Sequence, residues 1–194
     1  MVSVQALLAY ASIGYFLYKA CELVWQLMRP PIKLSSFGSW TVISGATDGI
    51  GKAMAFELAK QGQNLLIIGR NKEKLNQTVS EIQEKNKSIS IETLQIDLSS
   101  LHSKKELQDR YIQQIKDKDV GILINNAGLA YPYTNYFHEV EQERVESMLY
   151  VNNVASTILM QQTISNKFLS KKKSAIVNIS SAGAILPHPF HVVY

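Results

Sequence analysis

The 194-residue sequence predicts an α/β fold in which a doubly wound parallel sheet follows an N-terminal hydrophobic helix. Short apolar runs, typical of buried parallel strands, alternate with longer segments whose apolar residues recur at helical spacing. A glycine-rich turn joins the first apolar run to the first of these helices. Strands and helices that alternate in this way form parallel βαβ units with right-handed crossovers.

Five strands can be assigned in order along the chain. They are predicted over residues 40–44, 64–68, 91–96, 121–124 and 174–179. The helices between them are marked by apolar residues three or four positions apart, such as Leu75, Val79 and Ile82. A longer helix is predicted over 140–168, before the last strand.

Residues 1–34 differ from the rest and are predicted to form a membrane-anchor helix and a linker. Residues 2–18 carry no charge, and Lys19 and Glu22 then lie one helical turn apart before the apolar sequence continues. A membrane-spanning helix needs about 20 apolar residues, so spanning requires the bilayer to tolerate this pair of charges. Insertion at the membrane surface and a soluble helix packed on the domain are the alternatives.

Positive charge follows this segment, at Arg29 and Lys33. Because positive residues favour the cytosolic side of a membrane, residues 35–194 are expected to form a domain on that side.

Composition argues against two classes of partner. The formal net charge is +4, and no basic stripe interleaved with aromatic residues occurs, so we expect no nucleic-acid binding. Cys21 is the only cysteine, which excludes an intrachain disulfide, and His188 and His191 have no carboxylate or thiol nearby in the sequence, so we expect no metal site. The stretch around these histidines is expected to line a substrate entrance, and the aromatic residues of 131–137 either wall an apolar pocket or pack elsewhere.

The turn after the first strand has the composition of a phosphate-binding loop. Gly45, Gly49 and Gly51 occur within seven positions. We expect Gly45 to make the turn, Gly49 to let backbone approach phosphate, and Gly51 to let the helix pack on the strand. A helix N-terminus then faces the negative charge. This arrangement predicts a dinucleotide site, and an ordinary strand–helix turn is the alternative.

Further motifs follow in a characteristic order. They are Asn125-Asn-Ala-Gly128, Asn153-Val-Ala-Ser156, and Ser181 with Tyr194 thirteen residues later. With the turn 44–51, they resemble the motifs of the short-chain dehydrogenase/reductase superfamily over about residues 40–194. The apolar N-terminus and the 47–52 version of the turn resemble its membrane-bound 17β-hydroxysteroid dehydrogenase / very-long-chain 3-oxoacyl-CoA reductase group. The resemblance implies a Rossmann-like sheet of strand order 3-2-1-4-5.

The resemblance also implies a nicotinamide dinucleotide cofactor. The residues implied to bind it are Gly45, Thr47, Asp48, Gly49, Ile50, Gly51, Arg70, Asp97, Asn125, Ala127, Gly128 and Tyr194. Asp97 would contact the adenine ring, or else serve as a turn or cap residue. No acid occurs between Gln61 and Asn71, and the Arg70 guanidinium suits a 2′-phosphate, so we expect NADP(H) rather than NAD(H). Asp48 departs from relatives that carry a base at this position.

Three residues carry the catalysis that the resemblance implies. Tyr194 would donate a proton to a carbonyl, Ser181 would orient the carbonyl oxygen of the substrate, and Asn153, rather than Asn152, would hold a relay water. In the family a lysine follows the tyrosine after three residues and lowers its pKa. Because the sequence ends before that position, we expect a longer protein, and we expect residues 1–194 by themselves to be inactive and the sheet truncated.

The expected function is NADP(H)-dependent reduction of a ketone, or oxidation of the alcohol, on a lipid-like substrate: a 3-oxoacyl-CoA or a 17-keto/17β-hydroxy steroid. The alternatives are a catalytically inactive dinucleotide-binding or scaffold relative, and an NAD-linked alcohol dehydrogenase. Besides its apolar substrate, the protein is expected to contact membrane lipid and to form a homodimer when full-length. The expected location is the endoplasmic reticulum membrane, with the domain on the cytosolic side.

Overall fold

A computed structural model describes residues 3–30, 32–99, 103–166, 168–185 and 189–194. The chain divides into two compact units, Met1–Lys33 and Leu34–Tyr194. Each unit is described by itself.

The N-terminal unit consists of one long helix, α1 (Val4–Met28), at the position where the sequence predicts a hydrophobic helix. Ser3 caps it, with Oγ accepting a hydrogen bond of 3.2 Å from the amide of Ala6. Lys19 Nζ lies 2.8 Å from Glu22 Oε2, so the two charges that interrupt the apolar sequence form an ion pair. Among the described residues, α1 is the one helix with the length and composition to cross a membrane.

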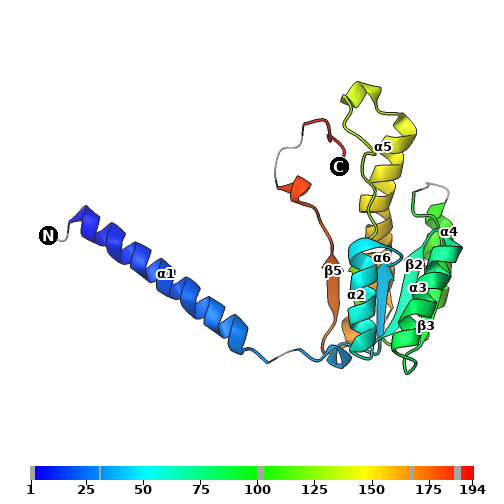
Figure 1. Cartoon of the computed structure of the whole chain (residues 1–194), viewed down its shortest axis with the longest axis horizontal. Helices are drawn as coiled ribbons and strands as arrows, with labels where there is room; N and C mark the ends of the chain where they lie inside the picture. The colour runs from blue at the N-terminus through cyan, green and yellow to red at the C-terminus, as the bar shows by residue number, and fades with distance from the viewer. Residues whose placement is uncertain (1–2, 31, 100–102, 167, 186–188) are drawn as a thin grey trace. The chain divides into compact units, whose positions relative to one another are not determined.

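The second unit is a parallel sheet with helices on both faces, which confirms the predicted fold class (Figure 1). Its strands are β1 (Trp40–Ser44), β2 (Asn64–Gly69), β3 (Ile91–Gln95), β4 (Val120–Asn125) and β5 (Ala175–Asn178). They pair in the order β3-β2-β1-β4-β5, as the family resemblance implies, and every pairing is parallel. The helices are α2 (Gly49–Lys60), α3 (Lys72–Lys85), α4 (Ser103–Ile115), α5 (Gln142–Leu149) and α6 (Ser156–Ser165).

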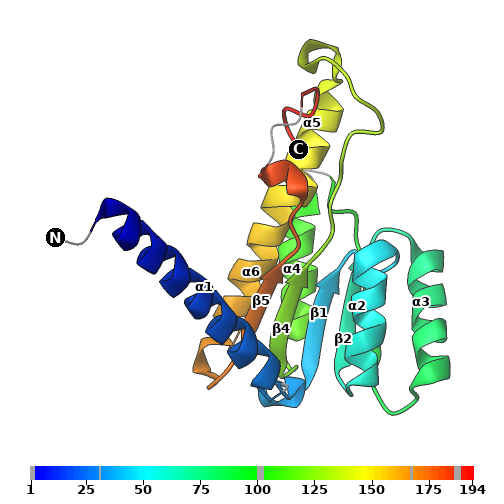
Figure 2. The ribbon, with the colours of Figure 1, turned by 60° about the vertical axis from the view of Figure 1, so that its left-hand side comes forward.

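Two apolar cores cover the two faces of the sheet because side chains alternate along each strand. Ile43, Leu65 and Ile67 point into the core that α2 and α3 share. Val42, Leu66 and Leu123 point into the core that α4 and α6 share. Figure 2 shows α2 and α3 on one face and α4 and α6 on the other. The continuous apolar runs of the sequence are therefore explained by burial on both sides.

The long helix predicted over 140–168 is shorter and is interrupted. It runs as α5, a π-helical segment at Tyr150–Ala155, and α6. Ser156 and Thr157 donate side-chain hydrogen bonds of 2.9 and 2.8 Å to the carbonyl of Asn153. These hydroxyls satisfy a carbonyl in the wider turn, and π-helical turns of this kind occur frequently at functional sites.

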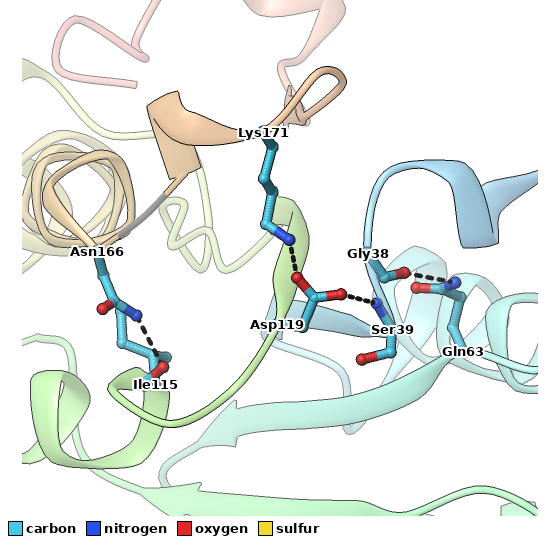
Figure 3. A network of polar contacts seen from close by, with 7 residues as sticks. All are labelled: Gly38, Ser39, Gln63, Ile115, Asp119, Asn166 and Lys171. Atoms are coloured by element: carbon cyan, nitrogen blue, oxygen red, sulfur yellow. Dashed lines mark hydrogen bonds and ion pairs between the residues drawn. The ribbon is translucent and has the colours of Figure 1, made fainter.

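At the amino edge of the sheet, where the strands begin, polar contacts around Asp119 connect neighbouring strands (Figure 3). Asp119 precedes β4, and its Oδ2 accepts a hydrogen bond of 3.0 Å from the amide of Ser39, which precedes β1. Its Oδ1 forms an ion pair with Lys171, which precedes β5. Gln63, before β2, donates to the carbonyl of Gly38 at 3.1 Å. The starts of four strands are thus joined through side chains.

A buried hydrogen bond joins α4 to α6 and allows a stability test. Tyr111 is fully buried, and its hydroxyl lies 2.6 Å from Thr163 Oγ1, which itself donates to the carbonyl of Leu159 at 2.7 Å. Tyr111 is therefore the donor. We expect Tyr111→Phe to lower the free energy of unfolding by about 1 kcal/mol, and Thr163→Val to lower it more, because the buried phenol then loses its acceptor.

Urea unfolding of the chain, followed by circular dichroism, measures both changes. The exposed Tyr133→Phe is the control and should leave the unfolding free energy unchanged. A cost for Thr163→Val no greater than that for Tyr111→Phe would contradict this account of the pair.

Candidate functional site

A cavity of about 660 Å³ opens at the carboxyl edge of the sheet. It lies among the turn after β1, the ends of β2 and β3, and the segment after β4, since parallel strands end at the same edge. The predicted cofactor residues that line it are Gly45, Thr47, Asp48, Gly49, Arg70, Asp97, Ala127 and Gly128. Ile50, Gly51, Asn125 and Tyr194 are not among its lining residues.

The three glycines of the turn have different physical roles. Gly45 has a φ of 69°, and a Cβ there would lie 2.8 Å from Ala127 Cα. Gly49 has a φ of 51°, and a Cβ there would meet nothing within 4 Å, so its backbone is open to the cavity. At Gly51, a Cβ would lie 2.4 Å from the carbonyl oxygen of Gly45. Gly51 therefore lets α2 pack against the turn itself, rather than against the strand as expected.

The segment after β4 is tied to this turn by Asn126 and Ser44. The Asn126 side chain donates to the carbonyls of Ser44 and Gly45 at 3.2 and 3.0 Å. In return, Ser44 Oγ accepts from the amides of Asn126 and Ala127, each at 3.1 Å. These four hydrogen bonds hold Ala127 and Gly128 beside the cavity.

Asn125 takes a different direction, because it still belongs to β4. It is buried, and its Nδ2 donates to Asn178 Oδ1 at 2.8 Å, while its carbonyl accepts from the amide of Ile179 at 2.8 Å. Its Oδ1 is buried with no hydrogen-bond partner in the part of the chain that the structure describes. Asn125 thus holds the end of β5 against β4.

Arg70 and Gly69 end β2 at the rim of the cavity. Arg70 is exposed, and its carbonyl accepts from Gln95 Nε2 at 3.4 Å. A Cβ at Gly69 would lie 3.3 Å from both Thr47 Cγ2 and Leu75 Cδ2. A side chain at position 69 would therefore crowd the turn after β1, which favours glycine there.

Other charged groups near the turn have partners of their own. Asp97 Oδ1 accepts from the amide and the hydroxyl of Ser99 at 2.9 and 2.7 Å, in a turn at the cavity wall. Lys52, on α2, forms an ion pair of 2.8 Å with Glu81 of α3, and the hydrogen bond from Lys52 lowers the pKa of Glu81.

Of the two neighbouring asparagines in the π-helical segment, only Asn152 is engaged with the loop after β4. Its Oδ1 accepts from the amide of Leu129 at 2.8 Å, and its Nδ2 donates to the carbonyl of Leu129 at 2.9 Å. The Asn153 side chain is exposed. The two asparagines therefore differ in their surroundings, and Asn153, the predicted relay residue, is the exposed one.

Ser181 and Tyr194 lie beyond the end of β5. The strand was expected to reach residue 179 but ends at Asn178, and Ser181 caps a short 3-10 helix by accepting from the amide of Gly183 at 3.2 Å. Tyr194 is 44% exposed. Neither residue lines the 660 Å³ cavity, and nor does Asn153, so the structure does not gather the proposed catalytic and cofactor residues around one cavity.

The aromatic loop after β4 contacts the segment that carries Tyr194. The hydroxyl of Tyr131 accepts from the amide of Val193 at 3.2 Å, and its ring meets that of His191 edge to face. The Tyr136 ring meets that of Phe190 in the same way, with centroids 5.2 Å apart. Tyr133, Tyr136 and Phe137 are nevertheless largely exposed. His188 lies outside the described residues, within which no three His, Cys, Asp or Glu side chains form a metal site.

Sequence reasoning missed several lining residues, including Asn71, Lys74, Ser99 and Leu129. Lys74 follows Arg70 by four positions, but Lys72 is nearer, so the basic residues after β2 did not by themselves single out Lys74. The clamp by Asn126 had no local signal, because both asparagines of the motif have the same chemistry.

Comparison with known proteins agrees with this architecture. The sequence profile described as short chain dehydrogenase matches residues 39–194. The very-long-chain 3-oxoacyl-CoA reductase of Homo sapiens is 36% identical over 183 residues, which are 94% of this chain and 57% of that protein. The inactive hydroxysteroid dehydrogenase-like protein 1 of Homo sapiens is 40% identical over 156 residues, 80% of this chain and 46% of that protein.

A solved structure of a short-chain dehydrogenase from Sphingobium yanoikuyae in complex with NADPH superposes with a TM-score of 0.69 at 29% identity, covering 79% of this chain and 58% of that one. The chain spans about half the length of the curated relatives that it matches. From the match over residues 39–194 and the shared sheet, the chain belongs to the short-chain dehydrogenase/reductase superfamily.

Proposed function

We propose that the protein is an NADP(H)-dependent oxidoreductase that reduces a ketone, or oxidises the alcohol, on a lipid-like substrate. The observation that carries this proposal is the cavity at the carboxyl edge, which combines open glycine backbone with Arg70 and Asp97. Glycine backbone at a helix N-terminus suits a pyrophosphate, and a guanidinium suits a 2′-phosphate. The residues present therefore fit a dinucleotide.

Each part of the cofactor has candidate residues. The backbone of Gly45, Thr47, Asp48, Gly49, Ile50 and Gly51 would hold the pyrophosphate, and Ala127, Gly128, Asn125 and Tyr194 would hold the nicotinamide half. Asp97 would face the adenine, and Arg70 the 2′-phosphate. The end of β2 carries Arg70 and no carboxylate, which supports NADP(H) over NAD(H). The Sphingobium relative was solved with NADPH.

The cofactor supplies hydride to a carbonyl carbon, and this chain would supply orientation and a proton. The Ser181 Oγ accepts from the amide of Gly183, which leaves its hydroxyl hydrogen to donate to a carbonyl oxygen. The Tyr194 hydroxyl would give the proton that converts the oxygen to an alcohol. Asn153 would hold the water that returns a proton to the tyrosine.

The proposed substrate is lipid-like, a 3-oxoacyl-CoA or a 17-keto/17β-hydroxy steroid. The names of relatives support these classes, since they include a very-long-chain 3-oxoacyl-CoA reductase and a hydroxysteroid dehydrogenase-like protein. The exposed aromatic loop offers apolar surface beside the segment of Tyr194.

The proposal also includes a homodimer of the whole protein.

A second candidate is a protein that binds the dinucleotide without turnover. It is favoured by one observation, that a relative 40% identical to this chain is named inactive. Here Ser181 and Tyr194 are both present, which supports catalysis.

We also propose that α1 anchors the protein in the endoplasmic reticulum membrane, with the second unit on the cytosolic side. Its 25 residues span about 37 Å at 1.5 Å per residue, enough to cross a hydrocarbon core of about 30 Å. The Lys19–Glu22 ion pair lowers the cost of placing two charges in that helix. Arg29 and Lys33 follow α1 and favour the cytosolic side.

The cofactor assignment predicts a selective loss at Arg70. Arg70→Ala should weaken binding of NADPH by about tenfold or more, because it removes a charge-assisted contact, and leave binding of NADH nearly unchanged. Fluorescence titration of each reduced cofactor measures the two affinities. Equal losses for both cofactors would rule out a 2′-phosphate contact at this residue.

Turnover tests the catalytic assignment. With NADPH and a panel of 3-oxoacyl-CoA and keto-steroid substrates, we expect the whole protein to consume NADPH and Tyr194→Phe to slow it by about 100-fold or more. Tyr10→Phe, at an exposed position of α1, is the matched control and should keep full activity. If NADPH binds but no substrate is turned over, the binding-only candidate is correct.

Membrane association can be tested by extraction. The protein should remain with membranes in alkaline carbonate, and its second unit should be digested by protease added from the cytosolic side. Removal of residues 1–30 should release the remainder. Extraction by carbonate would contradict the anchor, whereas protection from protease would contradict only the orientation.

A further inference from the structure

An aspartate and a lysine face each other across the rim of the cavity. Asp48 caps α2, and Lys74 lies in the first turn of α3, with Lys74 Nζ 3.9 Å from Asp48 Oδ2. Both residues line the cavity together with Arg70. The three side chains thus belong to one rim, although two of them lie on different helices.

The charge of Asp48 opposes anion binding at this rim. Its Oδ1 accepts from the amide of Gly49 at 2.8 Å, so the carboxylate is held at the N-terminus of α2. Asp48 and Asp97 both line the cavity, so without Lys74 its lining carries more negative than positive charge. A 2′-phosphate carries between one and two negative charges near neutral pH, so further positive charge is needed to bind it well.

Lys74 has a fixed backbone and a loosely held ammonium group. Its amide donates to Asn71 Oδ1 at 2.7 Å, and its carbonyl accepts from Thr78 Oγ1 at 2.8 Å. The distance of 3.9 Å to Asp48 exceeds that of a charge-assisted hydrogen bond, and both side chains are more than half exposed. An exposed pair of this kind contributes little to stability, so the flexible side chain can exchange its partner.

We propose that Lys74 is a second cation for the 2′-phosphate of NADP(H) and that Asp48 is its resting partner. The inference rests on the proposed NADP(H) function. Together with Arg70, Lys74 offsets the carboxylates of Asp48 and Asp97, and its ammonium moves from Asp48 to the phosphate when the cofactor binds. Specificity for the phosphorylated cofactor then depends on α3 as well as on the end of β2.

Two small ligands isolate this contact. Adenosine 2′,5′-bisphosphate and adenosine 5′-monophosphate differ only in the 2′-phosphate, and calorimetry of the whole chain measures binding of each without turnover. We expect Lys74→Gln to weaken binding of the bisphosphate by about tenfold and binding of the monophosphate by less than twofold. The loss should shrink at high salt, because the rim is exposed.

Lys72→Gln is the matched control. Lys72 is exposed in the same turn of α3 but is not among the cavity-lining residues, so its removal changes the net charge equally without removing the contact. Equal effects of the two substitutions on the bisphosphate would overturn the role of Lys74.

Asp48→Asn separates direct contact from neutralisation, because asparagine preserves the helix cap. We expect Asp48→Asn to strengthen binding of the bisphosphate. In the protein that carries Asp48→Asn, adding Lys74→Gln should still weaken that binding. If Lys74→Gln has no effect once Asp48 is replaced, then Lys74 only neutralises Asp48 and the direct contact is refuted.

The wild-type protein distinguishes failure of this inference from failure of the proposed function. If the wild type binds the bisphosphate no more tightly than the monophosphate, the NADP(H) assignment fails, and the role of Lys74 fails with it. If the wild type prefers the bisphosphate but Lys74→Gln behaves as Lys72→Gln does, only the role of Lys74 fails.

Discussion

The contact between the glycine turn after β1 and the segment after β4 is the constraint on which the cavity depends. Asn126 and Ser44 exchange hydrogen bonds across it. The approach is close enough that a Cβ at Gly45 would lie 2.8 Å from Ala127 Cα, and one at Gly51 would lie 2.3 Å from Asn126 Nδ2. Backbone and amide groups fill the space that side chains would occupy between the turn and the segment after β4. The turn is thus held from that side, and its other side stays open to the cavity.

The two edges of the sheet serve different purposes. At the amino edge, the polar contacts around Asp119 join the strand starts (Figure 3). At the carboxyl edge, the strands end in residues that bound a cavity. This polarity follows from parallel pairing, which brings all carboxyl ends to one side. The π-helical segment contributes at the same edge, where Asn152 binds Leu129 and Val151 lines the cavity. The loops after β4 and β5 then meet through Tyr131 and Val193.

The sequence alone determined the fold class and the N-terminal helix through local patterns, because buried strands appear as apolar runs and amphipathic helices as apolar residues three or four positions apart. The strand order came from the resemblance to the short-chain dehydrogenase/reductase superfamily, and the sheet has that order. The glycine turn was also predictable, because a positive φ at Gly45 and Gly49 is a local requirement that glycine satisfies. Eight of the predicted cofactor residues, Gly45, Thr47, Asp48, Gly49, Arg70, Asp97, Ala127 and Gly128, were placed by motif and do line the cavity.

Where two neighbouring asparagines have the same chemistry, only the tertiary structure decided which partner each of them contacts. Asn126 clamps the turn while its neighbour Asn125 pairs with Asn178, and Asn152 binds Leu129 while Asn153 is exposed. It also decided that Gly51 packs against the turn rather than the strand, and that Lys74 stands opposite Asp48. The physical reason is that these contacts join residues far apart in the chain, and their geometry depends on how closely separate elements approach. Chemical type can be read from a sequence, but the partner of a side chain is set only when the elements pack.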